Sequence, residues 1–273
     1  MTPATFVPAT LALPLSDGWT VARRNLFRMA RNPEVLIFST IMPIMFIVLF
    51  VYVFGSIPTP GISYENYVMA GIFAQTVVFN SSYTGVGLAE DIQKGIIDRF
   101  RSLPMARSAV LVGRTTSDVV NNVLVMAIMI VVGLAVGWRT STSILSVLAG
   151  IALLLLFAYV FSWIQATIGL SVKSVEAANS AGFIWMFPLT FVSNIFVDIS
   201  TLPTVFRVIA EWNPMSALVG ATRELFGNTS AQTMESSAWP IQHPIPASFL
   251  WMAVLLAIFV PLSIRQYKKA AAR

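Results

Sequence analysis

Six long stretches of this chain contain no charged residue. They cover residues 35–54, 66–89, 119–138, 140–172, 177–197 and 247–264. A helix needs about 20 mostly apolar residues to cross the hydrocarbon core of a bilayer. The pattern therefore predicts an all-α, polytopic membrane protein with six transmembrane helices.

The segment before the first stretch has a different pattern. Apolar residues recur at helical spacing from Trp19 to Met29, whereas Arg24 and Arg28 fall on another face. An apolar face with Trp beside a basic face is typical of a helix in the headgroup layer. We therefore expect an amphipathic interfacial helix over residues 16–31. It serves either as a topology anchor alone or also as a surface for a cytoplasmic partner.

The segment between the second and third stretches predicts a short helix over residues 90–104. Glu90 and Asp91 are expected at its start and two arginines near its end, which matches the helix dipole. An exposed apolar stripe on such a helix suits docking into a groove on another protein. The alternative is a solvated connector. The stripe consists of Ile92, Ile96, Phe100 and Leu103, the arginines are Arg99 and Arg101, and Pro104 ends the helix.

The long segment 198–246 precedes the last stretch on the opposite side. Its pattern predicts short helices over about 202–212 and 215–226, on the outer side of the membrane. The break between them falls at Asn213-Pro214, because proline disfavours helix at the residue before it. We expect re-entrant or short outer helices here.

Composition narrows the class of protein. Of the 273 residues, 56% are hydrophobic and 11% are charged, whereas a soluble domain has roughly 25% charged residues. This excludes a soluble enzyme and a nucleic-acid binder that acts through a basic surface. The chain has no Cys and one His, which excludes disulfides, thiol catalysis and His-pair metal sites. We expect neither a catalytic residue nor a metal site.

The net charge of +5 comes from basic residues that gather on one side of the predicted membrane. With six spans, both termini lie on the same side as the loops after the second and fourth spans, and these segments hold 14 of the 17 basic residues. The positive-inside rule places this side in the cytoplasm. We therefore expect both termini in the cytoplasm.

The chain lacks the motifs that would let it energise transport. No G-x-x-x-x-G-K-[ST] P-loop occurs in the sequence, so the chain is not expected to hydrolyse ATP. The predicted span cores contain no acid or base, which proton- or sodium-coupled carriers usually place there. The spans are therefore expected to guide an apolar molecule while another subunit supplies energy.

Aromatic and polar residues cluster in the first, second and fifth predicted spans. Most are expected to pack between helices or to face lipid. The alternative is a cavity for an amphipathic ligand, with Pro43 and Pro188 marking helix breaks where a pathway opens. The candidates for such a substrate pathway are Phe46, Phe50, Phe54, Phe73, Phe79, Asn80, Phe183, Trp185, Phe187, Phe191 and Asn194.

These features together resemble a known family. The specific part is the pattern E-D-x-x-K-G-x-x-x-R-x-R-S-L-P-x-x-R-x-x-x-x-x-G-R, which runs from Glu90 to Arg114. With six spans, a basic amphipathic amino-terminal segment and an outer N-P, it resembles the permease subunits of ABC-2-type ABC exporters, and among them the daunorubicin-resistance membrane subunits. The resemblance implies one transmembrane domain over 16–272, after a flexible tail over 1–15.

The resemblance also implies partners. Such permeases pair with a second copy or a paralogous permease and bind two copies of a cytoplasmic ABC ATPase, which holds ATP and Mg. The helix over 90–104 would be the coupling helix in a cleft of the ATPase, and the helix over 16–31 would flank the same subunit. The ATPase-contact candidates are then Glu90, Asp91, Lys94, Arg99, Phe100, Arg101 and Leu103, flanked by Trp19, Arg23, Arg24 and Arg28.

The expected function is export of a hydrophobic or amphipathic drug or lipid from the cytoplasm or the inner leaflet. The expected place is a bacterial cell membrane, in contact with lipids and without nucleic acid. The family also includes exporters of polysaccharides, so a glycan is the alternative substrate. A secondary carrier or channel that needs no ATPase is the alternative mechanism.

Overall fold

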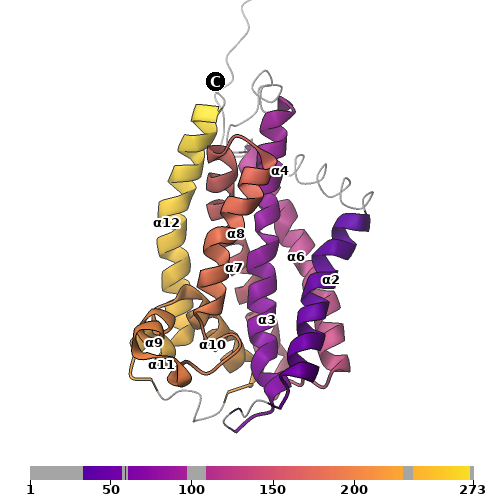
Figure 1. Cartoon of the computed structure of the whole chain (residues 1–273), viewed down its shortest axis with the longest axis vertical. Coiled ribbons are helices and arrows are strands. Elements are labelled where there is room, and N and C mark those ends of the chain that lie inside the picture. The colour runs from indigo at the N-terminus through magenta and orange to yellow at the C-terminus, as the bar shows by residue number, and fades with distance from the viewer. Residues whose placement is uncertain (1–32, 57–58, 60, 97–108, 230–235, 271–273) are drawn as a thin grey trace, which may run out of the picture.

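The computed structural model describes residues 33–56, 59, 61–96, 109–229 and 236–270. Every regular element within these ranges is a helix (Figure 1), in agreement with the predicted all-α class. The interfacial helix predicted over 16–31 lies outside them. In chain order the helices are α2 (Pro33–Val48), the π-helix η1 (Leu49–Val53), α3 (Tyr64–Asn80), α4 (Ser82–Gln93), α6 (Ala109–Ala135), α7 (Ile144–Ser171), α8 (Val175–Phe191), the 3-10 helix η2 (Ile199–Thr201), α9 (Thr204–Glu211), α10 (Pro214–Phe226), α11 (Trp239–Gln242) and α12 (Pro244–Ala270).

Three helices in the described part of the chain are long and apolar enough to cross a membrane. They are Gly113–Ala135 within α6, Ile144–Ser171 in α7 and Pro244–Tyr267 within α12. These helices correspond to the third, fourth and sixth predicted spans. The first, second and fifth predicted spans are also helical, but each is shorter or interrupted, so the total of six spans stays a prediction.

Each of these three predicted spans is interrupted at an identifiable residue. The first predicted span contains Pro43 in α2 and then changes to the π-helix η1. The second is divided at Ser81, whose hydroxyl donates to the Val78 carbonyl at 2.5 Å. The fifth ends with α8 at Phe191, three residues after Pro188. The predicted helix through residue 197 is therefore wrong in its last part, because the carbonyls beyond α8 are bonded by side chains of other helices.

The two short helices predicted on either side of the Asn213-Pro214 break are present as α9 and α10. The Asn213 side chain accepts a hydrogen bond from the Met215 N–H at 2.8 Å, and Pro214 occupies the first turn. Both features favour the start of a helix. α10 ends at Gly227, which has the left-handed φ of 73° that glycine adopts readily.

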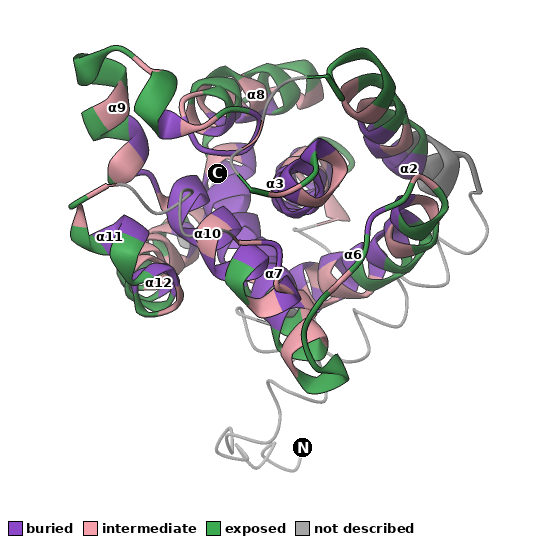
Figure 2. Ribbon diagram, turned by 90° about the horizontal axis from the view of Figure 1, so that it is seen from below, coloured by how far each residue is buried: buried purple, intermediate pink, exposed green. Residues whose placement is uncertain are grey.

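α3 lies at the centre of the bundle. Figure 2 shows it surrounded by α2, α6, α7, α8 and α10, with buried residues around most of its circumference. A helix that is apolar on every side is stable only when neighbours cover all of its faces. α3 therefore sets the positions of the surrounding helices.

The outward faces of the surrounding helices are apolar. Met45 on α2 is 60% exposed, Ile184 on α8 is 74% exposed and Phe249 on α12 is 51% exposed. Large apolar side chains gathered on the outside suit hydrocarbon rather than water as the surrounding solvent. The exposed faces thus agree with the membrane class that the sequence predicted.

α4 and α7 meet through two glycines. A Cβ atom added at Gly169 would lie 2.2 Å from the Gly85 carbonyl oxygen, and one added at Gly85 would lie 2.7 Å from the Gln165 carbonyl oxygen. Small residues let membrane helices approach backbone to backbone. This contact fixes α4, which continues α3, against the long helix α7.

Gly169→Ala is expected to destabilise the protein by about 2 kcal/mol, because the new methyl group forces two backbones apart. Gly133→Ala is the matched control. Its Cβ would lie 2.5 Å from the terminal methyl of Met69, the far end of a flexible side chain, and at an ordinary contact distance of 3.4 Å from the Trp138 ring. Thermal unfolding in detergent should give a clearly lower midpoint for Gly169→Ala than for Gly133→Ala. Equal midpoints would contradict the proposed backbone contact.

Candidate functional site

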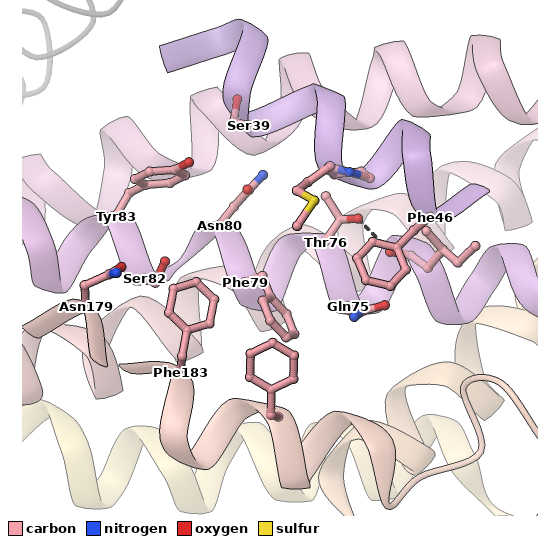
Figure 3. A pocket seen from close by; sticks show the side chains of 14 residues that line it. Ser39, Phe46, Gln75, Thr76, Phe79, Asn80, Ser82, Tyr83, Asn179 and Phe183 are labelled. Atoms are coloured by element: carbon pink, nitrogen blue, oxygen red, sulfur yellow. Dashed lines mark hydrogen bonds between the residues drawn. The ribbon is translucent and has the colours of Figure 1, made fainter. Parts of the chain in front are cut away.

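A cavity of about 210 Å³ lies between α2, α8 and the α3–α4 unit. Figure 3 shows side chains from these helices pointing toward one another across it. None of the described residues that line it is charged. The lining residues are Ser39, Met42, Pro43, Phe46, Ile72, Gln75, Thr76, Phe79, Asn80, Ser82, Tyr83, Asn179, Phe183 and Phe187.

Phenylalanine rings form the apolar wall of the cavity. The ring of Phe79 on α3 lies 5.6 Å from that of Phe183 and 5.3 Å from that of Phe187. Phe183 and Phe187 are four residues apart on α8, so they share one helix face. Phe46 on α2 completes this wall. Offset and edge-on rings leave aromatic surface available for a flat apolar ligand.

A strip of polar groups lies on the α3–α4 side of the cavity. The Thr76 hydroxyl donates to the Ile72 carbonyl at 2.7 Å, and the Asn80 amide donates to Asn122 Oδ1 on α6 at 3.3 Å. Gln75 is only 4% exposed, and its buried Oε1 has no hydrogen-bond partner. A buried acceptor without a partner is costly. Gln75 therefore contributes a polar side chain to the cavity lining whose Oε1 is not satisfied by any of the described residues.

The absence of charge in this lining restricts the ligand. Moving a charged group out of water without a counter-charge is strongly unfavourable. The cavity therefore suits a molecule that presents apolar or aromatic surface and a few neutral hydrogen-bonding groups. A charged group on such a molecule would have to remain outside this lining.

Five of the predicted pathway residues line the cavity: Phe46, Phe79, Asn80, Phe183 and Phe187. Three more, Phe50, Phe54 and Phe191, extend the same set of rings away from it. The structure thus brings together aromatic residues from three predicted spans that are far apart in the sequence.

The extension is a continuous row of stacked or tilted rings. The ring centroid of Phe50 lies 5.9 Å from that of Phe46 and 4.2 Å from that of Phe196. The ring of Phe191 lies 5.4 Å from that of Phe196 and 5.9 Å from that of Phe187, which again lines the cavity. α2, η1, α8 and the segment after α8 all contribute to it. The row joins the cavity to the non-helical segment that follows α8.

The remaining predicted pathway residues lie elsewhere. Phe73 packs edge-on against Trp138 at 5.3 Å, and Trp185 stacks on Phe161 at 5.5 Å, both inside the bundle. The Asn194 amide donates to the Ser216 carbonyl at 3.3 Å. These three side chains contact other helices rather than the cavity.

Sequence reasoning did not single out several residues that line the cavity. Gln75 and Tyr83 lie four residues before and after Phe79, so helical spacing from that ring would have found them. Ser82 and Asn179, like Gln75, are polar residues within the predicted spans that no further pattern distinguished from their neighbours. Met42 gave no signal, because an exposed Met is ordinary on a membrane helix.

Arg223 on α10 holds the segment that follows α8. It is 4% exposed, and its guanidinium donates to the Tyr67 carbonyl at 2.9 Å, to the Asn194 carbonyl at 2.7 Å and to the Ile195 carbonyl at 3.1 Å. Its Cζ also lies 3.6 Å from the centroid of the Tyr67 ring, within the range of a cation–π contact. The sequence identified Arg223 only as one of the outer basic residues.

The predicted docking helix does not begin where the sequence placed its start. Glu90 and Asp91 lie in the last turns of α4, and Gly95 follows with a left-handed φ of 64°. The expectation that these acids begin the helix is therefore wrong, because α4 continues past them and glycine ends it. Arg99, Phe100, Arg101 and Leu103 lie outside the described residues, as do Trp19, Arg23, Arg24 and Arg28.

The described residues of this region differ in exposure. The Lys94 ammonium lies 3.1 Å from a carboxylate oxygen of Glu90, and these side chains are 55% and 31% exposed. Asp91 is only 5% exposed. Glu90 and Lys94 therefore present groups to an approaching protein, whereas Asp91 is covered by the fold.

The prediction that the span cores contain no acid or base also needs correction. Asp118 is 9% exposed and lies within the apolar stretch Gly113–Ala135 of α6. It accepts a hydrogen bond from the Thr84 hydroxyl of α4, and Arg114 lies one turn before it. The sequence reading missed it because the third charge-free stretch was counted from residue 119, the residue after Asp118.

Comparison with known proteins matches this chain to a transporter family. The model of the ABC-2 type transporter family matches residues 17–226. The daunorubicin resistance ABC transporter permease protein DrrB1 of Streptomyces coeruleorubidus is 34% identical over 266 residues, covering 97% of this chain and 88% of that protein. The probable doxorubicin resistance ABC transporter permease protein DrrC of Mycobacterium tuberculosis is 19% identical over 252 residues, which cover 91% of this chain and 87% of that protein. The putative transport permease ycf38 of Porphyra purpurea is 23% identical over 230 residues, which cover 79% of this chain and 76% of that protein.

Arg223→Gln is expected to lower the free energy of unfolding by about 3 kcal/mol, because carbonyls of Tyr67, Asn194 and Ile195 lose buried donors. Arg207→Gln is the matched control, since that side chain donates to one exposed carbonyl, that of Ser200. The unfolding midpoints of both variants in detergent measure the effect. An equal decrease in the unfolding midpoint of both variants would show that the buried contacts of Arg223 do not stabilise the protein more than the exposed contact of Arg207 does.

Proposed function

Since the chain belongs to the ABC-2 type transporter family, we propose that it is the membrane-spanning permease subunit of an ATP-driven exporter. The substrate is a hydrophobic or amphipathic molecule, a drug or a lipid, taken from the cytoplasm or the inner leaflet. The observation that carries this proposal is the uncharged aromatic cavity between α2, α8 and the α3–α4 unit. Relatives of the chain carry the names of daunorubicin and doxorubicin resistance permeases, which supports a drug.

A separate ABC ATPase supplies the energy. The sequence has no P-loop, and permeases of this family work with an ATPase subunit. In this proposal two copies of that subunit bind ATP and Mg, and each permease contacts one of them through the region after α4. Glu90 and Lys94, which are partly exposed at the end of α4, belong to this contact, together with Arg99, Phe100, Arg101 and Leu103. Trp19, Arg23, Arg24 and Arg28 flank it.

The permease acts in pairs in a bacterial cell membrane, with six spans and both termini in the cytoplasm. Its partner is a second copy or a paralogous permease. Exposed apolar side chains on α2 and α8, including Met45 and Ile184, support a surface that is covered by lipid or by this partner. The position of basic residues along the sequence supports the orientation.

One observation favours the alternative of an ATPase-independent carrier. Such a carrier needs an ionisable group in its spans, and Asp118 is a buried acid in α6. Its carboxylate already accepts a bond from Thr84 and lies one turn from Arg114. We therefore assign it to the packing of the bundle and test the alternative directly.

The test of the proposal is transport in proteoliposomes. The permease and its ATPase are reconstituted together, and uptake of daunorubicin into inside-out vesicles is followed by fluorescence with ATP or with a proton gradient alone. We expect uptake only with ATP and only when both proteins are present. Uptake driven by a proton gradient through the permease alone would establish the carrier instead.

The cavity residues are tested in the same assay. Phe79→Ala and Phe183→Ala are each expected to raise the apparent KM for daunorubicin about tenfold, because a stacking contact is worth roughly 0.5–1.5 kcal/mol beyond the area that it buries. Phe249→Ala on the exposed face of α12 is the matched control and should leave KM unchanged. An unchanged KM in both cavity variants would contradict the assignment of the cavity as the binding site.

The ATPase contact is tested by charge reversal. Lys94→Glu is expected to reduce co-purification with the ATPase several-fold, because it places a like charge beside Glu90 and changes the docking surface. Lys269→Glu, at an exposed position near the end of α12, is the control. Equal recovery of the ATPase with both variants would remove Lys94 from the contact.

A further inference from the structure

Polar side chains connect α6 with α3 and α4 in a regular row. The Thr84 hydroxyl on α4 donates to Asp118 on α6, and the Asn80 amide on α3 donates to Asn122 Oδ1 on α6 at 3.3 Å. Exposure is 0% for Thr84, 6% for Asn80 and 2% for Asn122. Both contacts are therefore shielded from solvent and link helices across the interior of the bundle.

A third contact continues the row toward the start of α6. The Arg114 guanidinium donates to the Tyr83 carbonyl at 3.1 Å. It lies over Gly87 of α4, where an added Cβ would be 1.7 Å from Arg114 Nη2. A larger residue at position 87 would displace the guanidinium from this place. At this end of the row, the guanidinium of Arg114 thus packs against the surface of α4 at Gly87.

The spacing of these residues makes the row a property of one helix face. Arg114, Asp118 and Asn122 are separated by four residues each, so they lie along a single side of α6. Along this side Arg114 lies against Gly87, Asp118 against Thr84 and Asn122 against Asn80, so the facing residues run in the opposite direction along the chain. The exposed residues Val123 and Val131 of α6 fall outside the row, so one face of α6 is committed to the α3–α4 unit.

The two ends of the row lie at functionally distinct places. One end is Asn80, which lines the cavity. The other is Arg114, near the start of α6 at Ala109, directly after the segment 97–108 that contains most of the proposed ATPase contacts. Because side-chain hydrogen bonds hold one helix against another inside a membrane, a shift of α6 would be carried to the cavity wall.

We propose that this row, centred on the Thr84–Asp118 contact, transmits movement of the ATPase-contact segment to the substrate cavity. Thr84, Asp118 and Asn122 act as positioning residues, and none of them needs to touch substrate or nucleotide. The inference rests on the proposed function, because it takes the ATPase as the source of the movement. It goes beyond that function by assigning the route to one face of α6.

Because the chain contains no Cys, a single introduced thiol can be labelled without background from other thiols of the permease. A single Met45→Cys substitution places a thiol one turn of α2 from the cavity-lining residue Met42, at a position that is 60% exposed and does not itself line the cavity. The rate of maleimide labelling of this thiol is measured in the complex with the ATPase, without nucleotide and with ATP plus vanadate. The background protein must retain daunorubicin transport.

In this background Thr84→Val removes the central hydrogen bond while keeping the shape of the side chain. Asn122→Leu removes the bond to Asn80. Thr167→Val on α7 is the matched control, because the Thr167 hydroxyl is buried and bonds only within its own helix, to the Trp163 carbonyl at 3.0 Å. Thr84→Ser restores the hydroxyl and serves as the rescue variant.

We expect nucleotide to change the labelling rate several-fold in the background protein, in Thr167→Val and in Thr84→Ser. The same change should be reduced to less than twofold in Thr84→Val and Asn122→Leu, with ATP hydrolysis retained and less daunorubicin transported per ATP. A full nucleotide response in Thr84→Val and Asn122→Leu would overturn the inference.

The outcome also separates this inference from the proposed function. If nucleotide has no effect on labelling in the background protein and the ATPase does not bind, the proposed function fails. If the background protein responds and transports while the row variants behave like Thr167→Val, the function stands and only the role of the row fails. Unfolding midpoints of the two threonine variants within a few degrees of each other ensure that the comparison reports on coupling.

Discussion

The fold depends on how it satisfies the backbone carbonyls of a helix that ends inside the bundle. In a bilayer no water is available to bond them, so other parts of the protein must do so. α8 ends at Phe191, three residues after Pro188, and a non-helical segment follows it. Side chains of α3, of α10 and of Asn213 just before α10 donate to carbonyls at the end of α8 and in this segment. Asn213 bonds those of Leu189 and Val192, Arg223 bonds those of Asn194 and Ile195, Tyr67 also bonds that of Asn194, and Tyr64 bonds that of Phe196.

This constraint links α10 to the cavity. α10 is fixed against α3 because both hold the same segment, and α3 carries the polar strip of the cavity while α8 carries Phe183 and Phe187. The segment also carries Phe196, which stacks on Phe50 at 4.2 Å and closes the row of rings. Movement of α8 that opened the row would disturb the same hydrogen bonds. The shape of the cavity and the stability of the end of the bundle formed by α9, α10 and the segment after α8 therefore depend on one set of contacts.

The sequence predicted the parts of this arrangement that follow from patterns among residues close together in the chain. Charge-free stretches gave the helices, the Asn213-Pro214 pair gave the start of α10, and the density of phenylalanine gave most of the apolar cavity wall. It did not predict that α8 ends at Phe191 or that α4 extends past Asp91, because both depend on partners from distant helices. It missed Asp118 because a window drawn by charge ends at the charged residue, even when that residue lies buried within a long helix.

The central claim is that substrate occupies the uncharged cavity while a separate ATPase drives export. The most direct measurement is photolabelling of the reconstituted complex with a photoactivatable daunorubicin analogue, followed by mapping of the labelled residues. The account predicts label on α3–α4 within residues 75–83 and on α8 within residues 179–187, reduced by excess daunorubicin and changed by ATP. Label confined to lipid-facing residues of α12, with no competition by daunorubicin and no effect of ATP, would contradict it.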